Sequence, residues 1–300
     1  MNKLPKMIAI VGTNASGKSA IGIELAKHFG GEIISADSRQ VFKGLDLGSG
    51  KVTPEEMQGV PHHLIDICEP GEFFSMHDFQ KLAYKAADGI LSRGRLPFIV
   101  GGTGLYVDSV TEGYVMSDTP PDLAYRAHLE TFSTEVLYDM LTKLRPDVEV
   151  DSANRNRVMR ILEKIHDGDD VEGKRCPRYD CLKIGVTWDR PTLRERIDER
   201  LERRLAQGMI DEVQGLLDAG VSTQFLIKLG LEYKFITWYL TGEISSLDEM
   251  KELLATAIKQ FAKRQQIWFR KDKSIHWLNM RERPFDEAVK LIEQFTEADE

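Results

Sequence analysis

The sequence has little cysteine and no long apolar segment. Only three cysteines occur, Cys68, Cys176 and Cys181, and none forms the Cys-x-x-Cys spacing of structural zinc and redox sites. An odd, sparse set of cysteines provides no disulfide framework, which favours a reducing compartment. The N-terminus lacks the long apolar stretch and cleavage site of a secretory signal, and no segment is apolar enough to span a membrane. We therefore expect a cytoplasmic protein with no membrane partner.

Negative charge predominates overall, but positive charge is concentrated in two places. The net charge of -8 argues against a nonspecific polyanion binder. Between Lys259 and Lys273, however, there are six basic residues and one acidic residue, with Trp268 and Phe269 interleaved. Arg155, Arg157 and Arg160 form a second run at helical spacing. Each run is typical of a solvated helix face when taken alone, and it gains meaning only beside a functional site.

Apolar runs alternate with amphipathic stretches over much of the chain. The expected strands are 7–11, 32–35, 98–100, 182–188 and 275–278, and the expected helices include 19–29, 76–92, 192–218 and 246–269. Ser75 and Asp78 form a variant of the capping box at the start of 76–92. Strands separated by helices indicate parallel crossovers, so we expect an α/β fold whose ligands bind at the carboxyl ends of the strands.

The pattern changes between residues 113 and 181. This segment contains no convincing strand, whereas 124–130 and 154–165 have helical character. We interpret it as a helical insertion domain between two halves of a parallel-sheet core, formed by residues 1–112 and 182–300. The long helices after residue 188 belong to that core.

A phosphate-binding motif follows the first expected strand. It matches G-x-x-x-x-G-K-[ST] and consists of Gly12, Thr13, Asn14, Ala15, Ser16, Gly17, Lys18 and Ser19. Glycine lets backbone N–H groups turn toward phosphate oxygens, and the helix N-terminus adds positive potential. Lys18 and a Mg²⁺ ion held by Ser19 would neutralise further charge. A glycine-rich turn without a ligand is the alternative, and the motif alone does not separate kinases, nucleotide switches and other users of diphosphates.

Two polar residues are expected at the same edge of the sheet. Asp37 follows the second strand, and Thr103 follows a strand that ends in two glycines. Each side chain alone could simply cap a turn or a helix. Both together at the ligand-binding edge favour a catalytic site.

Six segments, in this order, resemble the tRNA dimethylallyltransferase family over nearly the whole length of the chain. They are the phosphate motif, ISADSRQVFKGLDLGSGK (Ile34–Lys51), PHHLID (Pro61–Asp66), LPFIVGGTGLY (Leu96–Tyr106), NRVMRILE (Asn156–Glu163) and AKRQQIWFR (Ala262–Arg270). Members of that family use Mg²⁺ and transfer a dimethylallyl group from its diphosphate to the exocyclic amine of the adenosine just 3′ of the anticodon. The resemblance implies a phosphate-loop core with a helical insertion, in agreement with the pattern of elements.

The resemblance also implies roles for individual residues. Asp37 matches the family's general base, Thr103 matches a residue that contacts the diphosphate, and Lys18 stabilises the leaving group. Lys228 is the expected further diphosphate contact, although the segment around it departs from the family's usual glycine-tyrosine pair. The implied tRNA contacts are Asp37, Ser38, Arg39, Gln40, Thr103, Arg126, Asn156, Arg157, Val158, Met159, Arg160, Lys263, Arg264, Gln265 and Arg270. We expect a monomer whose partners are dimethylallyl diphosphate and the anticodon stem-loop of tRNA.

Three other functions share parts of this pattern. An enzyme that prenylates free adenine nucleotides would have the same core but would need no basic RNA groove. A small-molecule kinase would transfer a phosphoryl group from ATP and would need an arginine-bearing lid. A nucleotide switch is less consistent, because the sequence shows no guanine-specific motif.

If the two basic runs bind tRNA, the affinity should fall steeply as salt is added. Replacing Arg157, Arg160 or Lys263 with alanine should flatten the plot of log K against log salt by about one unit for each phosphate that the side chain neutralises. Filter binding with an anticodon stem-loop at several salt concentrations measures this slope. An affinity that does not respond to salt would show that the basic runs are only solvated helix faces.

Overall fold

A computed structural model describes residues 3–116, 122–168 and 174–297. Contacts divide the chain into two compact units. Met1–Gly113 and Pro177–Glu300 form the first, called the core unit here, and Tyr114–Cys176 forms the second, the insertion unit. The sequence pattern places the insertion at 113–181, but residues from Asp180 onward already belong to a strand of the core sheet. Residues 117–121 and 169–173 of the expected insertion lie outside the described residues.

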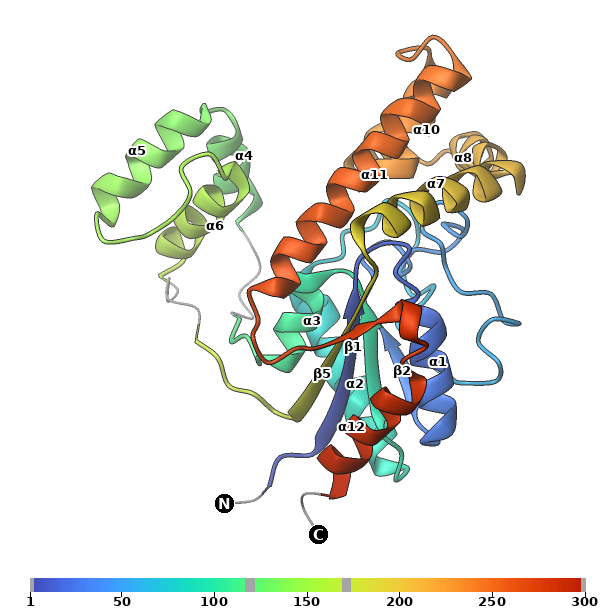
Figure 1. Cartoon of the computed structure of the whole chain (residues 1–300). Coiled ribbons are helices and arrows are strands. Elements are labelled where there is room, and N and C mark those ends of the chain that lie inside the picture. The colour runs from blue at the N-terminus through green and yellow to red at the C-terminus, as the bar shows by residue number, and fades with distance from the viewer. Residues whose placement is uncertain (1–2, 117–121, 169–173, 298–300) are drawn as a thin grey trace. The chain divides into compact units, whose positions relative to one another are not determined.

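The core unit contains a six-stranded sheet in the described part of the chain, in the order β3-β2-β4-β1-β5-β6 (Figure 1). All paired strands run parallel, which confirms the expected α/β class. The strands are β1 (Lys6–Gly12), β2 (Glu32–Ser35), β3 (His62–His63), β4 (Pro97–Gly101), β5 (Asp180–Thr187) and β6 (His276–Asn279). Each of the five expected strands overlaps an observed one. The two-residue strand β3 is not predicted by the sequence pattern, because it is too short to show a period.

Helices cover both faces of this sheet and its carboxyl end. The described helices of the core unit are α1 (Lys18–His28), α2 (Met76–Ser92), α3 (Gly104–Thr111), α7 (Arg190–Ala206), α8 (Met209–Asp218), α9 (Thr223–Leu229), α10 (Leu231–Thr241), α11 (Leu247–Arg270) and α12 (Phe285–Glu297). Side chains of β1 alternate between two hydrophobic clusters, since Ile8 and Ile10 pack with α1 and α12 whereas Met7, Ala9 and Val11 pack with α2 and α3. Both faces of the central strand are therefore buried.

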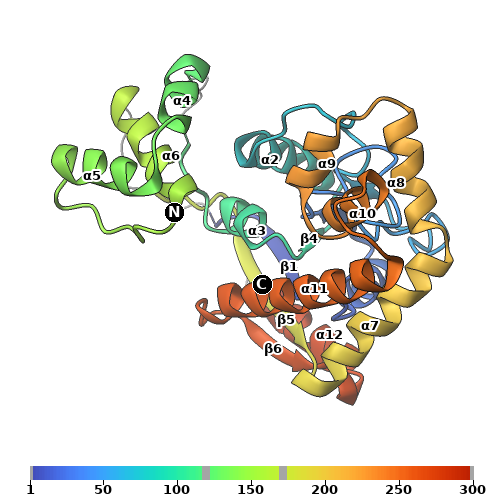
Figure 2. The same ribbon diagram turned by 90° about the horizontal axis from the view of Figure 1, so that it is seen from above.

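A third hydrophobic cluster joins α7, α8, α10 and α11. These helices lie beyond the carboxyl end of the strands (Figures 1 and 2). The cluster also takes in Val41, Phe42 and Leu45 from the segment after β2. This helical layer therefore packs directly over the sheet edge at which ligands are expected. No helix among the described residues combines the length and the apolar character that a membrane crossing requires.

Two helix predictions had different outcomes. The helix expected at 76–92 is observed with the same bounds, and Ser75 and Asp78 form the full capping box. The single helix expected at 192–218 is wrong, because α7 ends before Gln207 and α8 starts at Met209. Gly208 lies between them at φ 96°, a left-handed conformation that glycine adopts without strain and that ends the helical path.

The insertion unit is helical, with α4 (Leu123–Glu130), α5 (Thr134–Leu144) and α6 (Arg155–His166). Leu129, Leu137, Leu141 and Leu162 are among the residues of its own small hydrophobic core. The sequence indicates helices near α4 and α6 but not α5. Tyr114 and Arg175, near the two ends of the unit, form an isolated antiparallel bridge.

At the amino end of the strands, the carboxylate of Glu32, the first residue of β2, is surrounded by basic side chains. Its side chain is 3% exposed and accepts bonds from Arg93 Nη2 at 2.7 Å and Arg95 Nη1 at 3.0 Å. His63 Nε2 lies 2.7 Å from the same carboxylate. The bond from Arg93, followed by the contact with His63, lowers the pKa of Glu32 to about 2 against the cost of burial. One buried carboxylate thus joins β2, β3 and the end of α2.

We expect Glu32→Gln to lower the free energy of unfolding by about 1.5–3 kcal/mol at neutral pH, because the variant removes charge-assisted hydrogen bonds. The pKa of Glu32 is depressed in the folded state, so its contribution is present above the ordinary pKa of 4.5 and disappears as pH falls toward about 2. The gap between wild type and variant in urea unfolding should therefore narrow below about pH 4.5. Glu24→Gln, at an exposed site on α1, is the control. Equal unfolding midpoints for Glu32→Gln and wild type at pH 7 would contradict this role.

Candidate active site

The phosphate loop connects β1 to α1 with the geometry that the motif predicts. The backbone turns through left-handed conformations at Ala15 (φ 59°) and Gly17 (φ 91°). A Cβ at Gly12 would lie 2.7 Å from Ser16 Oγ and 2.8 Å from the Val186 carbonyl oxygen, so a larger residue does not fit there. The N-terminus of α1 consequently opens toward the loop, where its free N–H groups can receive an anion.

Gln265 from α11 supports this loop from the side. Its Oε1 accepts a 2.8 Å hydrogen bond from Asn14 N, and its Nε2 donates a 2.9 Å bond to the Gly102 carbonyl oxygen. The residue is 7% exposed. The family resemblance places it among the tRNA contacts. Both polar groups of its side chain are used inside the core unit, and its contact with tRNA stays a prediction. Gln265 positions the phosphate loop against the end of β4.

Asp37 and Thr103 meet at the carboxyl edge of the sheet. Thr103 Oγ1 accepts a 3.2 Å bond from Ser38 N, while Thr103 N donates to the Ala36 carbonyl oxygen at 3.2 Å. The Thr103 side chain therefore connects two strand ends and does not cap α3. Asp37 Oδ1 accepts a 3.0 Å bond from Arg39 N, as a turn residue would. Asp37 is only partly buried, which leaves its carboxylate accessible to a ligand.

Lys18 lies in the same region, where burial and nearby positive charges disfavour its protonated form. Burial lowers the pKa of Lys18 to about 8, with further lowering by Arg200 and Arg204 and an opposing effect of Asp37. Its ammonium donates to the Thr13 carbonyl oxygen at 3.3 Å. An anion bound on the loop would relieve this repulsion, because it would supply the negative charge that the site lacks.

Three arginines of α7 complete the site, and the sequence pattern does not single them out. Arg196 Nε donates a 3.0 Å bond to the Ala15 carbonyl oxygen. Arg200 and Arg204 line a pocket together with Asn14 and Ala15 of the loop. Burial, followed by repulsion from Arg204, lowers the pKa of Arg200 to about 10. The run RERIDERLERR resembles a solvated face, but the spacing of four between these arginines is a signal that they share one side of the helix.

Glu232 of α10 balances part of this charge. Its side chain is 3% exposed, and its carboxylate lies 3.1 Å from Arg39 Nη1 and 3.7 Å from Arg204 Nη1. The family resemblance implies that Arg39 contacts tRNA, but its side chain is only 15% exposed and its guanidinium already pairs with Glu232. Arg39 thus links the segment after β2 to the helical layer, and its contact with tRNA stays a prediction.

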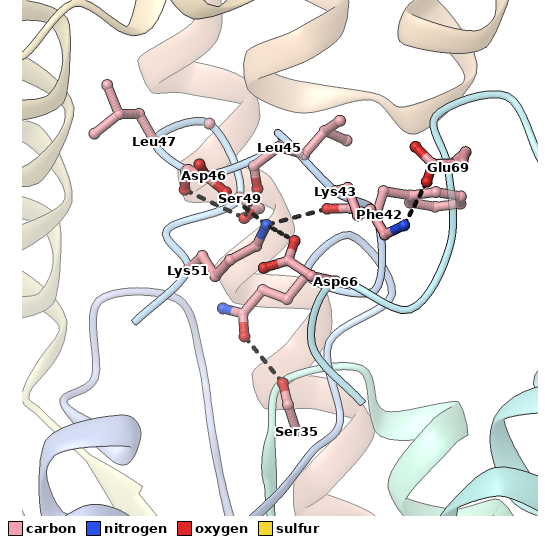
Figure 3. Close-up of polar contacts among 12 residues, drawn as sticks. Ser35, Phe42, Lys43, Leu45, Asp46, Leu47, Ser49, Lys51, Asp66 and Glu69 are labelled. Atoms are coloured by element: carbon pink, nitrogen blue, oxygen red, sulfur yellow. Dashed lines mark hydrogen bonds and ion pairs between the residues drawn. The ribbon is translucent and has the colours of Figure 1, made fainter. Parts of the chain in front are cut away.

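The segment after β2 is held in place by a set of polar contacts (Figure 3). Lys51 lies between Asp46, at 2.5 Å, and Asp66, and it also donates to the Phe42 carbonyl oxygen at 3.1 Å. Gln40 is 9% exposed, accepts from Ser35 Oγ at 2.9 Å and donates to the Gly50 carbonyl oxygen at 3.2 Å. These bonds hold Gln40 within the core unit, and its implied contact with tRNA stays a prediction.

The remaining expected contacts fall into two groups on the basis of exposure. In the insertion unit, the side chains of Val158 and Met159 are buried in its hydrophobic core, and their implied contact with tRNA stays a prediction. The side chains that keep exposure are Ser38, Arg126, Asn156, Arg157, Arg160, Lys263, Arg264 and Arg270. Lys228 is exposed in the last turn of α9, and no polar contact with a described residue brings it to the phosphate loop. Its role stays a prediction.

Comparison with known proteins agrees with this geometry. A family model described as IPP transferase matches residues 40–272, and one described as isopentenyl transferase matches residues 5–68. A protein named tRNA dimethylallyltransferase 2 from Shewanella sediminis is 46% identical, with 91% of this chain and 92% of the relative covered. The chain belongs to the tRNA dimethylallyltransferase family. The tRNA dimethylallyltransferase of Geobacillus thermodenitrificans is 41% identical, with 97% and 95% covered.

Solved structures of this family share the fold. The tRNA isopentenylpyrophosphate transferase of Bacillus halodurans superposes with a TM-score of 0.74 at 38% identity, covering 98% of this chain and 99% of its own. A eukaryotic dimethylallyltransferase acting on tRNA gives a TM-score of 0.80 at 27% identity, covering 92% of this chain and 74% of its own. The prenyltransferase family and the α/β fold that the sequence resemblance implies are both confirmed.

We expect Lys18→Ala to reduce turnover by at least about tenfold at saturating substrates, because the variant removes a charge-assisted interaction with the departing diphosphate. Binding of a stem-loop RNA should change little. Steady-state kinetics with filter binding measures both quantities, and Lys27→Ala, at an exposed position on the same helix, is the control. An equal loss of RNA affinity, or unchanged turnover, would contradict the placement of Lys18 at the diphosphate.

Proposed function

We propose that this chain transfers the dimethylallyl group of dimethylallyl diphosphate to the exocyclic amine of the adenosine 3′-adjacent to the anticodon of tRNA, with release of diphosphate. One observation carries the proposal: a carboxylate, Asp37, lies at the same sheet edge as the cationic phosphate loop with Lys18. The carboxylate can accept a proton from the acceptor, and the cationic loop can bind the anionic leaving group of the donor. The two relatives named tRNA dimethylallyltransferase above supply the substrate class.

Asp37 acts as the general base in this proposal. The lone pair of an adenine amine is delocalised into the ring, so the amine attacks poorly while it keeps both protons. As the new C–N bond forms and the C–O bond to the diphosphate breaks, one amine proton passes to the Asp37 carboxylate. The hydrogen bond from Arg39 N to Asp37 Oδ1 fixes the orientation of that carboxylate.

The leaving diphosphate is stabilised by the cations around the loop. Lys18, Arg200 and the amides at the start of α1 face the region where its charge develops. Their positions are set before the reaction by Gln265 and by the bond from Arg196 to the loop. Thr103 Oγ1, which lies at the strand end next to this region, contacts the diphosphate oxygen nearest the breaking bond. Lys228 is proposed as a further cation for the same anion.

The loop is compatible with Mg²⁺. Ser16 Oγ is buried in the loop and has no hydrogen-bond partner among the described residues, and Ser19 carries a hydroxyl in the first turn of α1. Mg²⁺ prefers oxygen ligands and commonly combines one protein oxygen with phosphate oxygens and water. Ser19 would hold the ion, which neutralises charge on the diphosphate when bound.

The RNA is bound by exposed basic residues in both units. On α11 these are Lys263, Arg264 and Arg270, and on the insertion unit they include Arg157 and Arg160. Arg126 and Arg160 both pair with Glu163, at 3.4 and 3.1 Å, which places the two guanidinium groups side by side. Asn156 and Ser38 supply neutral polar contacts. The protein acts as a cytoplasmic monomer in this proposal.

A transfer assay distinguishes the proposed function from its alternatives. The chain is incubated with labelled dimethylallyl diphosphate or labelled ATP, and it is offered unmodified tRNA or AMP. Transfer of the isoprenoid label to tRNA supports the proposal, and transfer to AMP alone identifies a nucleotide prenyltransferase. Transfer of phosphate from ATP to a small molecule, without prenyl transfer, identifies a kinase.

We expect Asp37→Asn to lower kcat by about 10²- to 10⁴-fold, because asparagine keeps the size and one acceptor oxygen but has almost no basicity. Single-turnover transfer with tRNA and dimethylallyl diphosphate both saturating measures the chemical step. Stability should be unaffected, since Asp37 lies in a partly exposed loop. Asp211→Asn on the exposed side of α8 is the control. A wild-type rate for Asp37→Asn would make the carboxylate a turn residue only.

A further inference from the structure

Trp268 near the end of α11 is exposed but held in a fixed position. The residue is 40% exposed, yet its indole Nε1 donates a 2.8 Å hydrogen bond to Asp108 Oδ2 on α3. The ring also packs on the first residue of α3, since a Cβ at Gly104 would lie 2.4 Å from Trp268 Cδ1. A large aromatic ring is thus presented to solvent with little freedom to reorient.

Two cations share the face of α11 that carries Trp268. Arg264 precedes it by four residues and Lys271 follows it by three, so all three side chains project from one side of the helix. The helical conformation extends to Lys271, the residue after the last turn. Arg264 and Lys271 are both exposed. The result is a stripe with positive charge on each side of an aromatic surface.

This stripe adjoins the candidate active site. Gln265, on the same turn of α11 as Arg264, bonds to the phosphate loop. Gly104, against which Trp268 packs, directly follows Thr103. A ligand on the stripe would therefore lie next to the groups assigned to the transfer reaction.

We infer that Trp268 is a stacking platform for one unpaired base of the RNA loop, with Arg264 and Lys271 at the flanking phosphates and Asp108 as the positioning residue for the indole ring. Unpaired bases of RNA are commonly bound by stacking on aromatic side chains beside cations. The flanking charges favour a nucleic acid over an apolar protein surface, because the centres of protein interfaces are depleted of charge. The inference rests on the proposed function, since it concerns the RNA substrate of that site.

The test compares Trp268→Leu, which removes the aromatic face, with Trp268→Phe, which keeps one. Stem-loop affinity is measured by filter binding at fixed salt. Loss of stacking on one base should weaken binding by about 5- to 150-fold in Trp268→Leu, whereas Trp268→Phe should retain most of the affinity. Asp108→Ala should produce part of the loss and Asp108→Asn should restore the affinity, because the amide oxygen can still accept the indole hydrogen bond.

Stem-loops with single abasic sites locate the base. At one loop position the abasic RNA should bind wild type and Trp268→Leu equally well, because the stacking partner is absent from both complexes. The same RNA should no longer quench the tryptophan fluorescence of wild type, and Trp268→Phe should lose this quenching with the intact stem-loop. Trp238→Phe, remote in sequence and packed in the helical layer, should keep it.

Three outcomes would overturn the inference. Unchanged stem-loop affinity in Trp268→Leu would refute the stacking role of Trp268. The proposed function would still stand if wild type prenylates tRNA. A rise in KM for dimethylallyl diphosphate without a change in RNA affinity would assign Trp268 to the isoprenoid pocket. Failure of wild type to bind or modify any tRNA would refute the proposed function and this inference together.

Discussion

Positive charge that is only partly balanced, at the carboxyl end of β1, is the constraint on which the site depends. Lys18 and Arg200 both have lowered pKa values because they are buried near one another and near Arg204. Asp37 and Glu232 are the carboxylates that oppose this charge. Without an anion the arrangement costs stability, and with a bound diphosphate the same groups become favourable. The charged side chains of the site are therefore in position before an anionic ligand binds.

Rigid placement of these charges comes from segments far apart in the sequence. Gln265 supports the phosphate loop from α11, and Arg196 supports it from α7. Glu232 brings α10 into contact with Arg39 after β2. Each contact also connects the helical layer to the sheet edge, and α11 carries both Gln265, which supports the phosphate loop, and exposed basic residues assigned to RNA. Catalysis by positioned charges requires this kind of fixed geometry.

The sequence predicts the parts of this structure that have a strong local signal. The phosphate motif, the five longer strands and the capped helix at Ser75 depend on nearby residues, and the structure contains all of them. The sequence does not predict the role of the α7 arginines. A run of charged residues looks the same whether its helix faces solvent or is covered by another helix. The sequence does not show that Val158 and Gln265 are buried, for a related reason: a motif on a helix includes residues from both faces, and only packing separates the buried from the exposed ones.

The order of strands in the sheet has a consequence for biosynthesis. β1 lies between β4 and β5, and the chain forms β5 only after the whole insertion unit. When the first 113 residues have left the ribosome, β1 can pair with β4, but its other edge has no partner until residues 180–187 emerge. An apolar strand with an open edge invites pairing with other chains. The nascent protein thus passes through an aggregation-prone interval, during which a chaperone that covers this edge would raise the yield of folded enzyme.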